Sequence, residues 1–360
     1  MSDNNKSVKT CKNIHVAIGD RTVRVGPLAG IPAIMHSLGC EPAPVFADTG
    51  FKLAQFEDPD IRIPYTAASK LLARCVAATG CQHLGLLVGE RSIPSHLGIA
   101  GYLLHGAPNV GIALRNLVKY LDLHDQGGVP SLATTGNSTL LGYAIHISGV
   151  QAADQIYDLS IAVACNIMRA LCGANWNPTE ILLMRRPPRD LTPYKHFFRA
   201  PLRFDAEESA IVFPTRWLDH QLPSADPLLQ DHLEREAEAL HAHQHADLIG
   251  DLRRLLRQCL SSRQCTATGI ARQLGIHERT LNRRLLAEGT SFRQELGRVR
   301  HNVSQQLLTG TNATLAEIAT ALGYADASTF SRAFRRWSGV APAQWRAQHA
   351  ATDEQTIGKC

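Results

Sequence analysis

The chain has 360 residues and a formal net charge of +5, with 44% hydrophobic and 19% charged residues. This length accommodates two or three domains, and the composition is that of a globular protein with a sizeable core. No apolar run approaches the roughly 18 residues that a membrane span needs. The polar N-terminus lacks the apolar segment of a signal peptide. We therefore expect a cytoplasmic protein with no membrane association.

Nine cysteines are scattered along the chain without a C-x-x-C pair. The odd count and the spacing argue against a disulfide framework and against a structural zinc site. We predict buried free thiols, which pack as small hydrophobic groups.

Positive charge is concentrated in the C-terminal part. Residues 1–250 carry 21 Lys and Arg against 24 Asp and Glu, whereas residues 251–346 carry 15 Arg, no Lys and six acidic residues. Such asymmetry indicates a nucleic-acid-binding region joined to a region of another kind. The guanidinium group suits phosphates and guanine edges, which favours the same interpretation.

In chain order, residues 1–12 are predicted to be disordered, and helices mix with short strands through residues 13–220. Periodicity and Pro or Gly boundaries predict helices over 27–39, 65–80, 98–106, 109–124 and 152–173. Alternating or short apolar runs predict strands over 138–147, 179–185 and 209–214. This mixture predicts an α+β domain.

A charged helix follows the Pro-rich boundary at residues 222–227. Its narrow apolar stripe consists of Leu229, Leu233, Ala237 and Leu240. The stripe packs either on the preceding domain or against a second copy of itself, and the sequence leaves both alternatives open.

The C-terminal region contains an internal repeat. Ile270, Ala271, Leu274, Gly275 and Ile276 recur 48 residues later as Ile318, Ala319, Leu322, Gly323 and Tyr324. Thr280, Leu281, Arg283 and Leu285 recur 49 residues later as Thr329, Phe330, Arg332 and Phe334. Each copy has a small alanine in a first helix, a glycine turn, and a second helix with two apolar residues four apart. This pattern predicts two helix-turn-helix motifs.

Helical geometry predicts which residues of the two second helices face away from the core. In the first copy Arg279, Arg283 and Leu286 lie opposite the buried pair, with Glu278 and Asn282 beside them. In the second copy Ser328, Arg332 and Arg335 lie opposite, with Ala327, Thr329 and Ser331 beside them. We predict DNA contacts from these residues other than Leu286, and from Thr280. Side chains of these types read base edges or hold phosphates of double-stranded DNA. Phe334 and Trp337 are expected in the core.

The run from residue 269 to residue 346 resembles the AraC/XylS family of bacterial transcriptional regulators. The matching positions are Arg279, Leu281, Arg283, Leu285, Gly289–Phe292, Glu317–Ala319, Leu322–Tyr324, Phe330, Arg332–Phe334, Trp337, Gly339, Pro342 and Arg346. The first 220 residues more weakly resemble the arabinose-binding-like effector domain of the ornithine-utilisation type. The resemblance implies seven C-terminal helices, with one long helix joining the two motifs, and each recognition helix in a neighbouring major groove.

His277 departs from the family pattern, which opens the first recognition helix with serine, a better N-cap. His277 either reaches a phosphate or is a poor cap that packing tolerates.

The resemblance and the element pattern together predict an α+β effector domain and an all-α C-terminal domain with two helix-turn-helix motifs. We expect a disordered N-terminus (1–12), an effector-binding and dimerisation domain (13–225), a linker helix (226–246), a DNA-binding domain (247–349) and a C-terminal tail (350–360). Tyr143, His146, Trp176 and Trp217 are candidates for lining an effector pocket, although core packing is the commoner role of such residues.

No enzyme signature is found: G-x-S-x-G, P-loop, G-x-G-x-x-G and paired-carboxylate patterns are missing from the sequence. His241, His243 and His245 lie on a polar helix without the spacing of a zinc site, so we predict a solvated face and no metal or cofactor.

The sequence therefore predicts a bacterial transcriptional regulator rather than an enzyme. Its expected partners are promoter DNA, a small-molecule effector, RNA polymerase and a second copy in a homodimer. Activation rather than repression is implied by the resemblance alone. The alternative is a ligand-independent DNA-binding regulator whose N-terminal domain serves only dimerisation.

Overall fold

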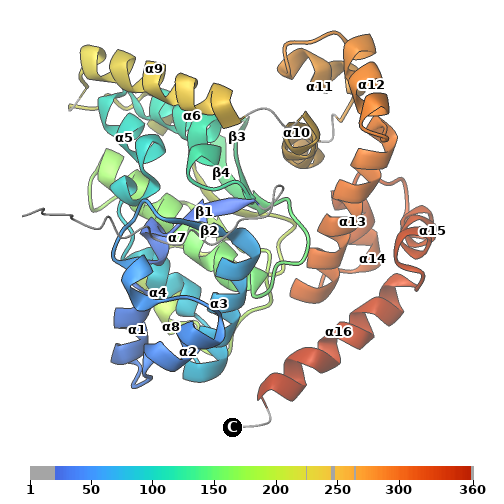
Figure 1. Ribbon diagram of the computed structural model, residues 1–360, viewed down its shortest axis with the longest axis horizontal. Helices are drawn as coiled ribbons and strands as arrows, with labels where there is room; N and C mark the ends of the chain where they lie inside the picture. Colours follow the sequence, from blue (N-terminus) through green and yellow to red (C-terminus); the bar gives the residue numbers. More distant parts are fainter. Residues whose placement is uncertain (1–20, 224, 245–247, 263–264, 358–360) are drawn as a thin grey trace, which may run out of the picture.

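The computed structural model describes residues 21–223, 225–244, 248–262 and 265–357. The predicted disordered segment 1–12 lies outside these residues. An N-terminal mixed α/β domain forms one side of the molecule, and helices α10 to α16 lie together on the other side (Figure 1).

The N-terminal domain contains a five-stranded sheet in the order β3-β4-β7-β5-β6. Its strands are β3 (Gly128–Thr135), β4 (Ser138–Ile145), β7 (Ser209–Pro214), β5 (Glu180–Leu182) and β6 (Leu202–Arg203). All pairs are antiparallel except β5 with β6. A separate antiparallel pair joins β1 (Thr22–Arg24) to β2 (Arg62–Pro64). The three predicted strands are present as β4, β5 and β7, whereas β1, β2, β3 and β6 were not predicted.

Eight helices of the N-terminal domain are described: α1 (Ile31–Ser37), α2 (Pro42–Asp48), α3 (Tyr65–Thr79), α4 (Leu84–Glu90), α5 (Ile99–Gly106), α6 (Val110–Tyr120), α7 (Ala153–Cys172) and α8 (Thr192–Phe198). The helix predicted over residues 27–39 is instead a 3₁₀ turn (Gly26–Leu28) followed by α1. The central helix α7 packs on β4 and β7 and also against α4. A side chain at Gly85 of α4 would collide with the Gln155 carbonyl, 2.0 Å from an added Cβ, so glycine is required for this close packing.

Helix α9 (Pro227–Gln244) packs on α5 of the N-terminal domain, as one of the two interpretations of its stripe predicts. Ala237 is fully buried and Leu233 is half-buried against the core. Leu229 and Leu240 remain 45% exposed, so they lie at the edge of this contact.

The C-terminal helices are α10 (Leu248–Ser262), α11 (Ala267–Gln273), α12 (Glu278–Ala287), α13 (Phe292–Gly310), α14 (Leu315–Ala321), α15 (Ala327–Ser338) and α16 (Pro342–Ile357). The last helix continues past residue 349, where the sequence places the end of the DNA-binding region. Among the described residues, no single helix is long and apolar enough to cross a membrane; α3 and α4 pass such a test only as a pair bent by 113°.

The prediction of free thiols is wrong for two cysteines. Cys259 and Cys265 form a disulfide that joins the last turns of α10 to the start of α11. The six-residue separation has no C-x-x-C signature, so sequence spacing did not reveal the pair. Cys75, Cys81 and Cys165 are buried free thiols, as predicted, and Cys40 and Cys172 are half-buried free thiols.

Candidate DNA-binding helices and an internal cavity

The first helix-turn-helix motif consists of α11 and α12. Thr266 caps α11 by accepting the Gly269 N–H, and Gly275 makes the turn with a φ of +65°. Only glycine adopts such a φ without strain, so the glycine ends the helix at this position. Leu281 and Leu285 on α12 are fully buried, as the four-residue spacing predicts.

The opposite face of α12 is open to solvent. Arg279, Asn282 and Arg283 are exposed. Thr280 is half-buried, and Glu278 accepts a hydrogen bond from Thr268 Oγ1 at 2.6 Å. Glu278 therefore ties α12 to α11.

His277 is the N-cap of α12. Its Nδ1 accepts the Arg279 N–H at 3.3 Å, which is long for such a bond. The structure thus supports the interpretation of His277 as a weak cap.

The second motif consists of α14 and α15. Thr314 and Glu317 form a reciprocal capping box at the start of α14, and Gly323 makes the turn with a φ of +70°. Phe330 and Phe334 of α15 are fully buried. Trp337 is only half-buried, contrary to the core placement predicted. Its ring packs beside His301 of α13, with 5.5 Å between the ring centroids.

The outer face of α15 repeats that of α12. Ser328, Arg332 and Arg335 are exposed, whereas Ala327, Thr329 and Ser331 are half-buried. Asp326 caps α15 by accepting the Thr329 N–H at 2.7 Å, and the Thr329 hydroxyl donates to the same carboxylate at 3.1 Å. Thr329 therefore orders the start of α15.

The long helix α13 joins the two motifs. Near its start, buried Glu295 accepts hydrogen bonds from Arg253 Nε of α10 at 2.7 Å and from Thr290 Oγ1 at 2.6 Å, and it also pairs with Arg298. These charged partners lower the pKa of Glu295 against the effect of burial, which raises it. Beyond its end, Arg346 of α16 donates to the Leu308 and Ala313 carbonyls. Both ends of α13 are thus fixed to neighbouring helices.

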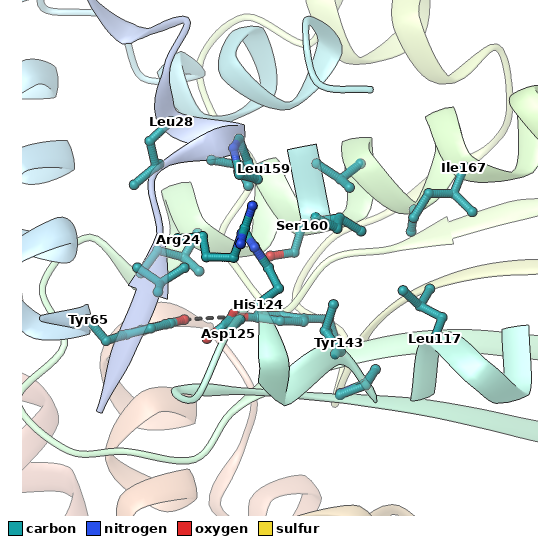
Figure 2. Close-up of a pocket in the computed structure, with 18 of the residues that line it drawn as sticks. Arg24, Leu28, Tyr65, Leu117, His124, Asp125, Tyr143, Leu159, Ser160 and Ile167 are labelled. Carbon is teal, nitrogen blue, oxygen red and sulfur yellow. Dashed lines mark hydrogen bonds between the residues drawn. The ribbon is translucent and has the colours of Figure 1, made fainter. Parts of the chain in front are cut away.

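A second feature is an internal cavity of about 90 Å³ in the N-terminal domain (Figure 2). It lies between the β1 segment, α3, α6, β4 and α7, and its wall is mostly aliphatic, including Leu28, Leu72, Leu117, Leu141, Leu159 and Ile167. Polar groups are confined to Arg24, Tyr65, His124, Asp125, Tyr143 and Ser160. Largely apolar cavities with a few placed polar groups are typical of small-molecule sites.

The tyrosines and the aspartate of this wall bond to one another. Tyr65 and Tyr143 hydroxyls lie 2.8 Å apart, and the Tyr143 hydroxyl donates to Asp125 Oδ2 at 2.5 Å. Asp125 Oδ1 accepts the N–H groups of Gly127 and Gly128. Burial raises the pKa of Asp125, while these hydrogen bonds and nearby Arg62 lower it.

Among the four residues proposed for an effector pocket, the structure brings only Tyr143 to this cavity. His146 is buried with Nε2 bonded to the Gln126 carbonyl at 2.8 Å. Trp176 packs edge-on against Phe213, and Trp217 lies half-buried beside His220. Sequence reasoning missed Arg24, Tyr65, His124 and Asp125, because elements distant in sequence bring them together.

The two domains touch through α10, α13 and the residues after α13. Asn312 donates to both carboxylate oxygens of Asp205, at 2.9 and 3.2 Å, and its Oδ1 accepts from Arg186 Nε at 3.1 Å. Gln306 accepts from the Tyr157 hydroxyl at 3.1 Å. Gln258 of α10 donates to the Pro130 carbonyl at 3.0 Å. Tyr157 and Pro130 belong to α7 and β3, which also contribute to the cavity wall.

The histidines of α9 form no described metal site. His241 pairs with Asp122 at 3.2 Å rather than facing solvent alone. The side chains of His243 and His245 lie outside the described part of the chain. No group of three or more His, Cys, Asp or Glu that could hold a metal ion is found among the described residues.

Comparison with known proteins matches both halves of the chain. Residues 39–222 match the arabinose-binding domain of AraC transcription regulators, and residues 270–348 match a helix-turn-helix domain. The chain belongs to the AraC family. This AraC-family protein is an HTH-type DNA-binding transcriptional regulator and not an enzyme.

Relatives span most of the chain. The Ornithine utilization regulator of Pseudomonas aeruginosa is 29% identical over 302 residues, covering 81% of this chain and 86% of that protein. The HTH-type transcriptional regulator VirS of Mycobacterium tuberculosis is 26% identical over 331 residues, covering 90% and 96%. The crystal structure of the transcriptional regulator CdpR from P. aeruginosa covers 85% of this chain and 96% of its own at 24% identity, with a TM-score of 0.42.

Proposed function

We propose that this AraC-family regulator reads promoter DNA with the exposed faces of α12 and α15, and that a small molecule bound in the N-terminal cavity controls that binding. The observation that carries the DNA part is the matched pair of second helices. Each buries two residues four apart and exposes two arginines on its opposite face.

We divide the proposed DNA-contact residues by their exposure and by the hydrogen bonds that their side chains make. Arg279, Asn282 and Arg283 on α12, with Ser328, Arg332 and Arg335 on α15, are open to solvent and are assigned to bases or phosphates. Of these, Arg332 also donates from Nη2 to the Thr329 hydroxyl at 3.3 Å, which leaves its other guanidinium nitrogens for DNA. Glu278 and Thr329 bond within their own motifs, so we assign them to positioning the helices. Thr280, Ala327 and Ser331 are half-buried and flank the contact face.

The effector part is supported by the cavity and its position. A ligand that favours one arrangement of α7 and β3 over another shifts the population of domain arrangements, because α7 contacts α13 and β3 contacts α10 of the C-terminal domain. The name of one relative mentions ornithine, but Asp125 is the only acidic side chain that lines the cavity, so at most one of the two ammonium groups of ornithine would have a carboxylate partner there.

The resemblance further favours a homodimer that activates transcription through RNA polymerase. The partly exposed Leu229 and Leu240 at the edge of the α9 contact are available for a second copy. A reporter gene fused to the target promoter distinguishes activation from repression by the sign of its change when the gene for this chain is deleted.

Substitution of the exposed arginines tests the DNA face. Arg283→Ala and Arg332→Ala should each weaken promoter binding by about 1–3 kcal/mol if the side chain reads a base. Arg216→Ala removes one exposed positive charge from the N-terminal domain and serves as the control. Fluorescence anisotropy titrations at fixed salt measure all three, and equal affinities for Arg283→Ala and Arg216→Ala would contradict the assignment.

A thermal-unfolding screen of small molecules separates effector control from the ligand-independent alternative. A ligand of the folded state raises the melting temperature by mass action. The alternative, in which the N-terminal domain only dimerises, predicts that no compound which raises the melting temperature also changes promoter affinity.

A further inference from the structure

One end of the cavity carries polar groups that lack partners. His124 is 5% exposed, and its Nδ1 has no hydrogen-bond partner among the described residues. Buried Arg24 Nε is likewise unpartnered, although Arg24 Nη2 donates to Asp60. Figure 2 shows the Arg24 and His124 side chains side by side, with the Ser160 hydroxyl pointing toward them. Unsatisfied buried polar groups in a cavity indicate a missing polar partner.

The protonation of these groups limits what that partner can be. Burial, with Arg62, Arg24 and His96 nearby, lowers the pKa of His124 to about 3, so the ring is neutral. A neutral imidazole can donate from Nδ1, and the Arg24 guanidinium can only donate. The group that satisfies both is therefore an acceptor.

Asp125, Tyr65 and Tyr143 already have hydrogen-bond partners within the protein. Both oxygens of Asp125 accept hydrogen bonds, and the Tyr65 and Tyr143 hydroxyls bond to each other. A cationic ligand held by Asp125 would leave the donors at Arg24 Nε and His124 Nδ1 without an acceptor. A sugar would place several hydroxyl groups against leucine and isoleucine side chains, where they would lose their hydrogen bonds to water.

We infer that the cavity binds a short monocarboxylic acid, with its carboxylate on Arg24 Nε and His124 Nδ1 and its hydrocarbon chain among the leucines. Arg24 lies at the outer end, because its side chain is 18% exposed and reaches Asp60, which is 72% exposed. An apolar cavity of about 150 Å³ holds benzene. The cavity of about 90 Å³ therefore suits a chain of about four carbons. The inference rests on the proposed effector role of the N-terminal domain.

Four compounds with five carbons test the ligand class: pentanoate, pentan-1-ol, pentan-1-amine and L-arabinose. Isothermal titration calorimetry on the full chain should show pentanoate binding at least ~10-fold more tightly than the other three, because only the carboxylate makes charge-assisted hydrogen bonds to both donors. Tighter binding of the amine or of arabinose would overturn the inference, as would no binding of any of the four.

Variants locate the site. Arg24→Gln should weaken pentanoate binding at least ~10-fold and leave pentan-1-ol binding unchanged, a split that a general loss of structure does not produce. Arg91→Gln, at an exposed arginine of the same domain that does not line the cavity, is the matched control and should bind pentanoate normally. Ala68→Leu fills part of the cavity and should weaken pentanoate and pentan-1-ol together. Equal pentanoate affinity in wild type and both cavity variants overturns the site.

Promoter affinity with and without the compounds separates this inference from the proposed function. Pentanoate that binds with the expected variant pattern but leaves promoter affinity unchanged supports the ligand class and contradicts effector control. Arabinose that binds and changes promoter affinity overturns the ligand class and supports effector control.

Discussion

Two histidines of the N-terminal domain are buried in the neutral form. His124 is 5% exposed and His146 is 6% exposed. Burial lowers the pKa of His124 to about 3 and that of His146 to about 4. An unfolded histidine titrates near 6.5. Each therefore takes up a proton more readily in the unfolded chain than in the folded one.

The sign of the pH dependence follows from this difference. The contribution of each neutral histidine to stability is fully present above pH 6.5 and is lost as the pH falls toward the folded-state pKa. At pH 5 the loss amounts to about 2 kcal/mol for each residue. Urea unfolding at pH 7.5 and pH 5.0 should show this loss in the free energy of unfolding. His146→Asn should reduce the loss by the part that one histidine contributes, about 2 kcal/mol. A fall of equal size in the variant would contradict the assignment to His146.

At the scale of elements, the two helix-turn-helix motifs were largely predictable. Their buried pairs, glycine turns and outward arginines follow from spacing within one or two helices, so a short stretch of sequence contains the whole pattern. The sequence favoured a weak cap at His277 over a phosphate contact, and the long Nδ1 contact with the Arg279 N–H supports the weak cap. The prediction that Trp337 lies in the core was wrong. The sequence does not show that its neighbour on α13 is His301 or that the indole stays half-buried.

The sheet and the cavity were less predictable. Strand β3 was missed, and the order β3-β4-β7-β5-β6 depends on pairings between distant segments. Arg24 and His124 meet only because β1 lies beside the end of the η4 turn (Leu121–Leu123), where the Arg24 N–H donates to the His124 carbonyl. Local periodicity contains no information about such contacts. Tyr143, the predicted candidate that does line the cavity, lies on β4, and the sequence shows the alternation of this strand.

The disulfide beside the first motif makes a prediction at the element scale. Cys259–Cys265 restrains the connection between α10 and α11. Closing so short a loop stabilises the folded state by about 2 kcal/mol in the chain-entropy model. Reducing agent should therefore lower the melting temperature of the wild type but not of a Cys259→Ser, Cys265→Ser double variant. An unchanged wild-type melting temperature would show that the bond contributes nothing to stability.

At the scale of the whole molecule, the two domains are joined by hydrogen bonds from α10, α13 and the residues after α13. Asp205 holds Asn312 just beyond α13, and both side chains are accessible to solvent. Asp205→Ala should weaken this contact by about 1 kcal/mol, which corresponds to roughly five-fold faster hydrogen exchange of the Asn312 amide. Asp219→Ala, at an exposed carboxylate away from the contact, is the control. Exchange of Asn312 at the wild-type rate in the Asp205 variant would mean that other contacts suffice to hold the domains together.

Helix α13 is one uninterrupted element of 19 residues, with Val299, Val303 and Leu307 buried along its length. Its length of about 28 Å holds the two motifs apart at a nearly constant distance. Once one motif is bound to DNA, the other meets its own site at a high effective concentration rather than by free diffusion. If both motifs bind DNA as proposed, they form a tight complex only on DNA whose two sites have the separation that the helix sets.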